Sequence, residues 1–229
     1  MRKTDQKRQH ILDTAYRLFQ SKGFANTSMS EITAEAGGSK ATVYNYFPSK
    51  EELFVECMTN ISDQYIDGIF SGLQDFKGEL QAALLETVKD ALRVLCSLEM
   101  LASKRLLIAE AERSGIGKLF CRKMDGYMGE LAAILRRAMD EGQLRQDDPL
   151  LAARQFRALL EADIVERCLM GAQTAPPSAV AISRAAEDAV ATFLTAYAPT
   201  GDADTSIATV VSRPRERVNR LPKANDSDP

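Results

Sequence analysis

The chain is poor in the residues that most catalytic and metal sites use. Its 229 residues contain one histidine, four cysteines and no tryptophan. His10 lies among charged residues, and Cys57, Cys96, Cys121 and Cys168 are far apart, so their spacing indicates neither a catalytic triad nor a zinc site. No glycine-rich phosphate loop occurs either. We therefore expect no enzymatic activity, no metal and no cofactor, with reduced thiols in apolar surroundings.

Strand signals and long apolar runs are also missing. Alternating β-branched residues are rare, whereas Ala, Leu, Glu, Lys and Arg recur at intervals of three and four, the period of a helix. No apolar run reaches the roughly eighteen residues that span a bilayer, and no basic-then-apolar leader is present. These features predict an all-α, soluble, cytoplasmic protein of about nine helices that does not bind a membrane.

The most distinctive stretch that the chain does contain lies between residues 27 and 53. Ser28 and Glu31 have the spacing of a capping box, which predicts a helix that ends at the glycine pair 37–38. Ser39 then caps a second short helix, and a further capping box begins a third. Two helices joined by a glycine-containing turn form a helix-turn-helix, whose second helix enters the major groove of DNA.

The second of these helices carries polar and aromatic residues on its outer side. Val43 and Phe47 share the apolar side and are expected in the core, whatever the function. Short helices that merely bury a small core are the alternative explanation, but they leave the outward residues unexplained. That outward set suits phosphates and base edges. It comprises Lys40, Thr42, Tyr44, Asn45 and Tyr46, with Lys50 at the start of the third helix.

Residues 1–53 resemble the N-terminal DNA-binding domain of the TetR family of transcriptional regulators. The resemblance includes an upstream helix that ends in the sequence KGF at 22–24, followed by family residues at the family's spacing. These are Thr27, Ser28, Ile32, Ala36, Gly37, Ser39, Thr42, Tyr44, Phe47, Ser49, Lys50, Glu52 and Leu53. The chain departs from the family pattern at Gly38, where an apolar residue is usual, and at Ala41, where glycine is frequent.

The resemblance implies roles for individual residues on an operator. The phosphate backbone would be held mostly by Thr27, Ser39, Tyr44, Tyr46 and Lys50. Base edges would be faced by Lys40, Ala41 and Asn45. The helix N-termini at Ser28 and Ser39 add backbone N–H groups and a partial positive charge.

The distribution of charge agrees with DNA binding, although the total does not. The chain carries a formal net charge of −3, which would disfavour a polyanionic partner. Residues 1–50, however, contain eight basic and four acidic residues, whereas the rest contains 21 basic and 28 acidic residues. Arg2, Lys3, Lys7 and Arg8 at the N-terminus could reach DNA or serve as a solubilising tail.

The sequence predicts a second, larger helical unit after the head. We expect a helix-turn-helix domain at 1–53, a helical regulatory and dimerisation domain at 54–197, and a disordered tail at 198–229, rich in Pro, Ser, Asp and Arg. Apolar periodicity predicts helices from Leu53 to about Phe70, from about Leu80 to 95, from 98 to 113 and from 120 to 138. Two more are predicted at 149–170 and 178–197, each with a capping residue.

Residues 105–120 and 141–171 resemble the C-terminal domain of AefR-like members of the TetR family. In that family the last two helices pair with those of a second copy, which implies a homodimer and an operator with two inverted half-sites. The interface residues expected here are Leu151, Gln155, Phe156, Leu159, Ile182, Ala186, Val190 and Phe193. Packing within a single chain is the alternative for each of them.

The larger unit is expected to bind a small-molecule effector whose identity the sequence does not reveal. An apolar pocket could be lined by Tyr65, Met100, Phe120, Met124, Tyr127, Met128 and Phe156. Ordinary core packing is the alternative for these residues. A ligand wedged there would shift the helix that follows the head and release the operator, so the function expected is that of a repressor.

Two other functions remain open at this point. A redox or metal sensor could use two of the four cysteines. A helical enzyme or scaffold with no DNA role is a further alternative, which leaves the capped helices and their outward side chains unexplained.

Overall fold

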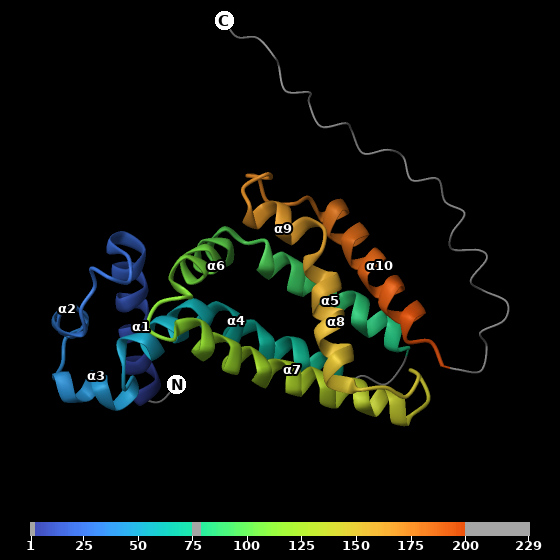
Figure 1. The fold of residues 1–229 in the computed structure, drawn as a ribbon, viewed down its shortest axis with the longest axis horizontal. Helices are drawn as coiled ribbons and strands as arrows, with labels where there is room; N and C mark the ends of the chain where they lie inside the picture. Colours follow the sequence, from blue (N-terminus) through green and yellow to red (C-terminus); the bar gives the residue numbers. More distant parts are fainter. Residues whose placement is uncertain (1–2, 75–78, 200–229) are drawn as a thin grey trace, which may run out of the picture.

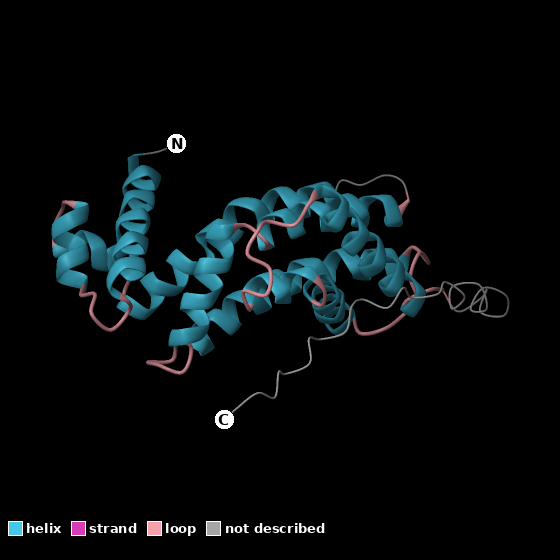
Figure 2. Ribbon diagram, turned by 90° about the horizontal axis from the view of Figure 1, so that it is seen from above, coloured by secondary structure: helices cyan, strands magenta, loops and turns pink. Residues whose placement is uncertain are grey.

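The computed structural model describes residues 3–74 and 79–199, except for the side chains of residues 3, 61, 62, 64–72 and 74. These described residues form ten α-helices and no strand (Figures 1 and 2). The helices are α1 Lys3–Lys22, α2 Met29–Ala36, α3 Lys40–Tyr46, α4 Lys50–Gln74, α5 Leu80–Leu95, α6 Leu98–Glu110, α7 Ile116–Asp140, α8 Pro149–Glu161, α9 Ile164–Leu169 and α10 Ala179–Ala196. The all-α prediction is confirmed. Within the described part, no helix has the length and apolar composition needed to span a membrane.

The head consists of α1–α3 packed on the first turns of α4. Its core is built around three aromatic rings: the Phe54 ring centroid lies 5.1 Å from those of Phe19 and Phe24, with edge-to-face geometry in both pairs. Ile11, Ile32 and Val43 from α1–α3 are fully buried beside them. Helices of seven or eight residues are unstable alone, so this shared core is what keeps α2 and α3 folded.

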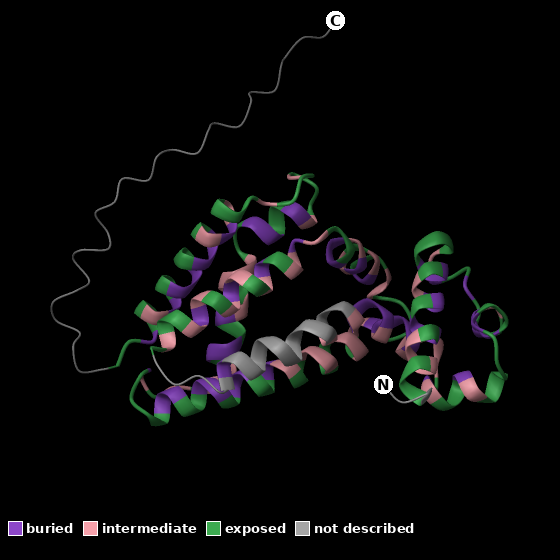
Figure 3. Ribbon diagram, turned by 180° about the vertical axis from the view of Figure 1, so that it is seen from behind, coloured by how far each residue is buried: buried purple, intermediate pink, exposed green. Residues whose placement is uncertain are grey.

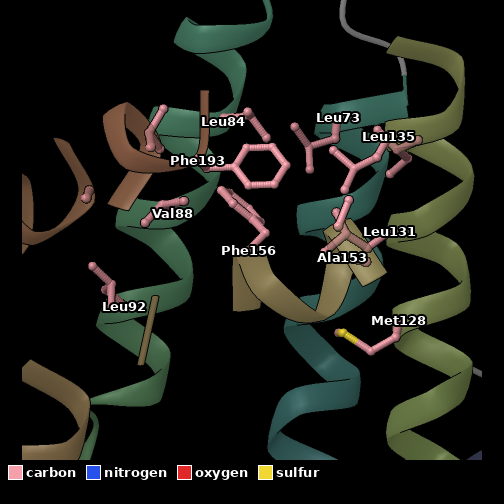
Figure 4. Packing of buried hydrophobic residues seen from close by; sticks show 14 of the residues in the cluster. Leu73, Leu84, Val88, Leu92, Met128, Leu131, Leu135, Ala153, Phe156 and Phe193 are labelled. Atoms are coloured by element: carbon pink, nitrogen blue, oxygen red, sulfur yellow. The ribbon is translucent and has the colours of Figure 1, made fainter. Parts of the chain in front are cut away.

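The body consists of the remaining helices, with α4 and α7 running side by side from the head (Figure 1). At the far end α5, α8 and α10 complete a core of apolar side chains, including Leu84, Leu135 and Phe193 (Figure 4). The Phe193 ring lies 4.7 Å from the rings of both Phe156 and Tyr197. Buried and exposed residues alternate along most helices, as amphipathic helices require (Figure 3).

Head and body are joined by α4 and by contacts from α6 and α7. Leu107 of α6 and Ile116 of α7 are buried in the core of the head. The hydroxyl groups of Tyr16 in α1 and Ser103 in α6 lie 2.9 Å apart. Head and body are therefore connected by packed side chains and a hydrogen bond as well as by the 25-residue α4.

One helix prediction is wrong in detail. The segment expected as a single helix at 149–170 is broken at Ala162 and Asp163 into α8 and α9. No glycine or proline occurs inside it, so the break has a tertiary cause. Arg105 of α6 donates hydrogen bonds to the carbonyl oxygens of Cys168 and Leu169, at 2.6 and 2.8 Å, which holds α9 against α6.

The tail predicted at 198–229 lies outside the described residues from position 200 onward. The expected boundaries of the helices at 98–113, 120–138 and 53–70 differ by several residues from those of α6, α7 and α4. The capping residues were the reliable signals. Ser28, Ser39, Asp148 and Ser178 all accept hydrogen bonds from the first turn of the helix that follows.

Candidate DNA-binding surface and effector cavity

The turn between α2 and α3 depends on two glycines and a lysine. Gly37 and Gly38 have φ angles of 65° and 132°, which a residue with a side chain adopts only under strain. Lys7 of α1 donates a 3.1 Å hydrogen bond to the carbonyl oxygen of Ala36 and another to that of Gly37. The departure from the family pattern at Gly38 therefore has a structural use, and Lys7 closes the end of α2.

The recognition helix, α3, is held at its start by Ser39. The Ser39 hydroxyl oxygen accepts a hydrogen bond from the backbone N–H of Thr42 at 3.1 Å, and the two hydroxyl groups lie 2.9 Å apart. Val43 is the buried residue of this helix. The cap leaves the remaining N–H groups of the first turn pointing outward, where an anion can bind.

The outer face of α3 matches the predicted contact surface. Lys40, Ala41, Tyr44 and Asn45 are all exposed, and the Lys40 ammonium lies 5.8 Å from the centroid of the Tyr44 ring. Tyr46 is half-buried, and its hydroxyl donates to the carbonyl oxygen of Thr4 at 3.3 Å. An amide, an ammonium and two phenol groups thus lie on one short helix. These groups can form hydrogen bonds with base edges and phosphates.

Two predicted phosphate contacts need correction. The Thr27 side chain is only 1% exposed, and its hydroxyl donates to the carbonyl oxygen of Gly23 at 2.9 Å. The Lys50 ammonium donates to the carbonyl oxygens of Phe24 and Thr27, both at 2.9 Å, and lies 4.1 Å from the centroid of the Phe24 ring. Both side chains fix the loop before α2, and sequence spacing alone does not separate that role from a DNA contact.

A partly open cavity of about 160 Å³ lies in the body between α4, α5, α6, α7 and α8, and we call it the effector cavity after the role that the sequence predicts for it. Six of the seven residues predicted for an apolar pocket line it: Met100, Phe120, Met124, Tyr127, Met128 and Phe156. The seventh, Tyr65, lies outside the residues whose side chains are described. The lining also includes Met58, Thr87, Ala91 and Leu95, which the sequence analysis missed because they continue the same apolar stripes as core residues.

One edge of the cavity is charged. Lys104 of α6 and Arg157 of α8 both contact a carboxylate oxygen of Glu161, at 3.1 and 3.3 Å. The three residues also line the cavity. Two cations share one carboxylate, so this edge has an excess of positive charge beside an otherwise apolar space.

The predicted interface residues divide into two groups. Phe156, Ile182, Ala186, Val190 and Phe193 are 6% exposed or less and pack in the core of the chain itself. They have almost no side-chain surface left for a second copy, which corrects their assignment. Leu151 is 45% exposed, Gln155 is exposed and accepts a hydrogen bond from the Tyr197 hydroxyl, and Leu159 is half-buried.

All four cysteines are free thiols, and two of them, Cys96 and Cys168, lie next to each other. Cys57, Cys96 and Cys168 are buried, and Cys121 is exposed. Burial raises the pKa of the Cys57 thiol far above its usual range and that of Cys96 to about 12. Thiols held in the neutral form are poor nucleophiles and poor metal ligands. Among the described residues, no three His, Cys, Asp or Glu side chains are grouped as a metal site would require.

Both halves of the chain match known protein families. Residues 11–57 match the bacterial regulatory proteins of the tetR family, and residues 82–199 match the C-terminal domain of AefR-like transcriptional repressors. The HTH-type transcriptional regulator YfiR of Bacillus subtilis is 23% identical over 174 residues, which are 72% of this chain and 81% of YfiR.

Solved structures give the same result. A TetR-family transcriptional regulator from Mesorhizobium loti has a TM-score of 0.70 at 28% identity, covering 86% of this chain and 100% of that chain. The flavonoid-responsive regulator FrrA has a TM-score of 0.65 at 28% identity, covering 86% of this chain and 99% of FrrA. The similarity thus extends over both the capped helices of the head and the helices around the cavity.

Proposed function

Because the chain belongs to the TetR family of transcriptional regulators, with an AefR-like C-terminal domain, we propose that it represses transcription from an inverted-repeat operator and is released by an apolar small molecule. The family and its relatives are DNA-binding regulators and not enzymes. The proposal goes further than the family in four respects: the operator geometry, the homodimer, the residues that contact DNA and the class of effector. We place its action in the cytoplasm, because bacterial DNA is there.

The outer face of α3 carries the DNA-binding part of the proposal. Asn45 offers an amide that can bind N6 and N7 on the major-groove edge of an adenine, and Lys40 offers an ammonium for guanine. Tyr44 on the exposed side of the helix and Ser39 at its N-cap would hold phosphates, as the family resemblance implies. One such helix reads only a few base pairs, so two heads related by a two-fold axis would read the two half-sites.

A homodimer would use the outer faces of α8 and α10. On α8 the exposed residues Leu151, Gln155 and Ala158 follow one another at helical spacing. On α10 Val180, which is 79% exposed, begins a similar exposed stripe that includes Ala191. Small and polar residues of this kind allow close approach of two helices across a symmetric interface.

The cavity supports the effector part of the proposal. An apolar cavity of about 150 Å³ binds benzene, so the cavity of about 160 Å³ here would accommodate a body of one aromatic ring. Methionines and aromatic rings dominate its lining and adapt to flat molecules. The similar regulator FrrA is described as flavonoid-responsive, which favours an aromatic effector for this chain as well.

The test has two stages. Selection from random double-stranded oligonucleotides should yield an inverted repeat, and Asn45→Ala should relax the preference at one position in each half-site while weakening binding by about 1–3 kcal/mol. A panel of substituted phenols should then contain compounds that raise the melting temperature and weaken operator binding. If no sequence is enriched, the DNA proposal fails; if every compound that raises the melting temperature leaves operator binding unchanged, the effector proposal fails.

A further inference from the structure

A series of polar contacts connects the effector cavity with the head. Tyr127, which lines the cavity, donates its hydroxyl hydrogen to a carboxylate oxygen of Asp63 on α4. The Lys123 ammonium on α7 lies 2.7 Å from the other oxygen of Asp63 and 3.0 Å from Oε1 of Glu56. Glu56 Oε2 lies 2.6 Å from a guanidinium nitrogen of Arg8 on α1. The five residues, which we call the polar relay, join three helices.

The relay ends against the recognition helix. The Arg8 guanidinium carbon lies 5.2 Å from the ring centroid of Phe47, the residue that ends α3. The Phe47 side chain is 2% exposed, so it moves with the core of the head. Arg8 belongs to α1 and contacts the residue at the end of α3. A change in the position of Arg8 therefore affects both helices.

The junction around the relay has room for rearrangement. A hollow of about 370 Å³ lies between α1, α3, α4 and α7. Aromatic and charged side chains line it, among them Arg8, Phe47, Glu56 and Lys123. Close-packed interiors hold side chains in a single arrangement, whereas a hollow permits charged groups to change partners. The contacts of the relay can thus be exchanged without unfolding the joint.

Lys123 is the branch point, because one ammonium serves two carboxylates. Burial raises the pKa of Asp63 above its usual value, and Lys123 offsets this only in part. Burial also acts to raise the pKa of Glu56, but Lys123 and Arg8 outweigh it and the pKa lies below its usual value. The charged form of Asp63 therefore needs both of its donors, the Lys123 ammonium and the Tyr127 hydroxyl. When it loses the Tyr127 hydroxyl, it draws more strongly on Lys123, and Glu56 loses that cation.

We propose that the polar relay reports the state of the effector cavity to the recognition helix, with Tyr127 as the sensing residue and Lys123 as the residue that positions Glu56 and Arg8. The inference rests on the proposed function, since it requires an operator and a cavity that controls it. The occupant that triggers the relay is a molecule whose apolar body displaces the Tyr127 ring or whose hydrogen-bond acceptor takes the Tyr127 hydroxyl. The acceptor competes with Asp63 for the Tyr127 hydroxyl.

An intact relay favours operator binding. Two heads must match two half-sites at once, and a head held in one orientation loses less conformational freedom on binding than a free one. Breaking the relay leaves Arg8 as the only cation of the relay on Glu56, which changes the position of Arg8 and of the end of α3, so operator affinity falls. An effector that takes the Tyr127 hydroxyl has the same consequence as a mutation in the relay.

The first test uses Lys123→Met with the full chain and an operator obtained by oligonucleotide selection. We expect operator binding at least about fivefold weaker than wild type, the lower end of common coupling energies. Lys123→Arg, which keeps the cation, should restore most of the affinity. The matched control is Lys89→Met, because the Lys89 side chain is 18% exposed against 19% for Lys123. Lys89 pairs with Glu86 on α5 and is not among the residues that line the cavity.

The second test measures coupling along the relay. Tyr127→Phe removes one oxygen atom and should weaken operator binding in the same direction, and the double variant with Lys123→Met should bind no more weakly than Lys123→Met alone. Gln146→Ala, which breaks a 2.7 Å hydrogen bond to the Met139 carbonyl oxygen, should leave operator binding unchanged. Non-additive losses of operator affinity are expected if both residues act on the operator through the relay, whereas independent effects add.

The outcomes separate the relay from the function it rests on. If the wild-type chain enriches no operator, the proposed function fails. If it binds an operator but Tyr127→Phe and Lys123→Met change the affinity no more than the two controls, or act additively, the relay is overturned and the function stands. Should Lys123→Met fail to fold by circular dichroism, Tyr127→Phe decides alone, and an unchanged affinity overturns the relay.

Discussion

The N-cap of the recognition helix should be more important for DNA binding than for overall stability. Ser39→Ala removes the oxygen that accepts the 3.1 Å hydrogen bond from Thr42 N–H. Loss of such a cap costs about 1 kcal/mol, which is roughly a fivefold change in the equilibrium between formed and frayed helix. The α3 helix has only seven residues and one buried side chain, Val43, so it has little packing to offset the loss.

Amide hydrogen exchange and operator binding together measure this effect. Exchange of the amides in α3 should become about fivefold faster in Ser39→Ala, and operator affinity should fall. The control is Ser178→Ala, which removes an equivalent cap from the 18-residue α10. It should lower the unfolding free energy by a similar amount and leave operator affinity unchanged. Unchanged exchange in α3, or equal losses of operator affinity in the two variants, would refute the reasoning.

Three further predictions concern the joint and the thiols. Lys50→Met removes two hydrogen bonds to backbone carbonyl oxygens and should lower the unfolding free energy by about 1–3 kcal/mol in urea denaturation; no change would mean that the loop is held by other contacts. Glu56 has a lowered pKa, so the stability it contributes is present above its ordinary value of 4.5 and lost as the pH falls through the folded value. The advantage of wild type over Glu56→Gln in unfolding free energy should therefore shrink below about pH 4.5, whereas a pH-independent difference would contradict the ion pairs. A thiol reagent should label Cys121 alone in the native chain and all four cysteines in denaturant, and rapid labelling of a second native thiol would contradict the burial of the others.

Local signals in the sequence predicted the head well. Capping serines, the glycine pair and the apolar spacing act over a few residues, and each is visible in the sequence as it is used in the fold. The signals fail where a side chain has two possible partners. Lys50 and Thr27 were assigned to phosphates because of their position, yet their polar atoms bind backbone carbonyl oxygens within the head. Sequence spacing does not show where a long or rotatable side chain ends.

The body shows a different limit. Helical periodicity identified the apolar faces of α8 and α10, but it does not say whether such a face meets its own chain or a second copy. In the structure those faces pack in the core of the chain itself, and Phe193 and Val190 are 1% exposed or less. Contacts between distant segments were likewise invisible. The pairing of Lys123 with Glu56, 67 positions away, depends on how α4 and α7 are packed and has no signature in either segment.

Filling the effector cavity tests the central claim, that occupancy of the body controls the recognition helix, without requiring a known effector. Ala91 lines the cavity and is half-buried, and Ala91→Phe places a benzyl group in a space of about 160 Å³. The measurement is operator affinity of this variant beside wild type, with a melting curve to show that both are folded. The account predicts binding at least about fivefold weaker in Ala91→Phe. Equal affinity in a folded variant whose cavity is filled would contradict it.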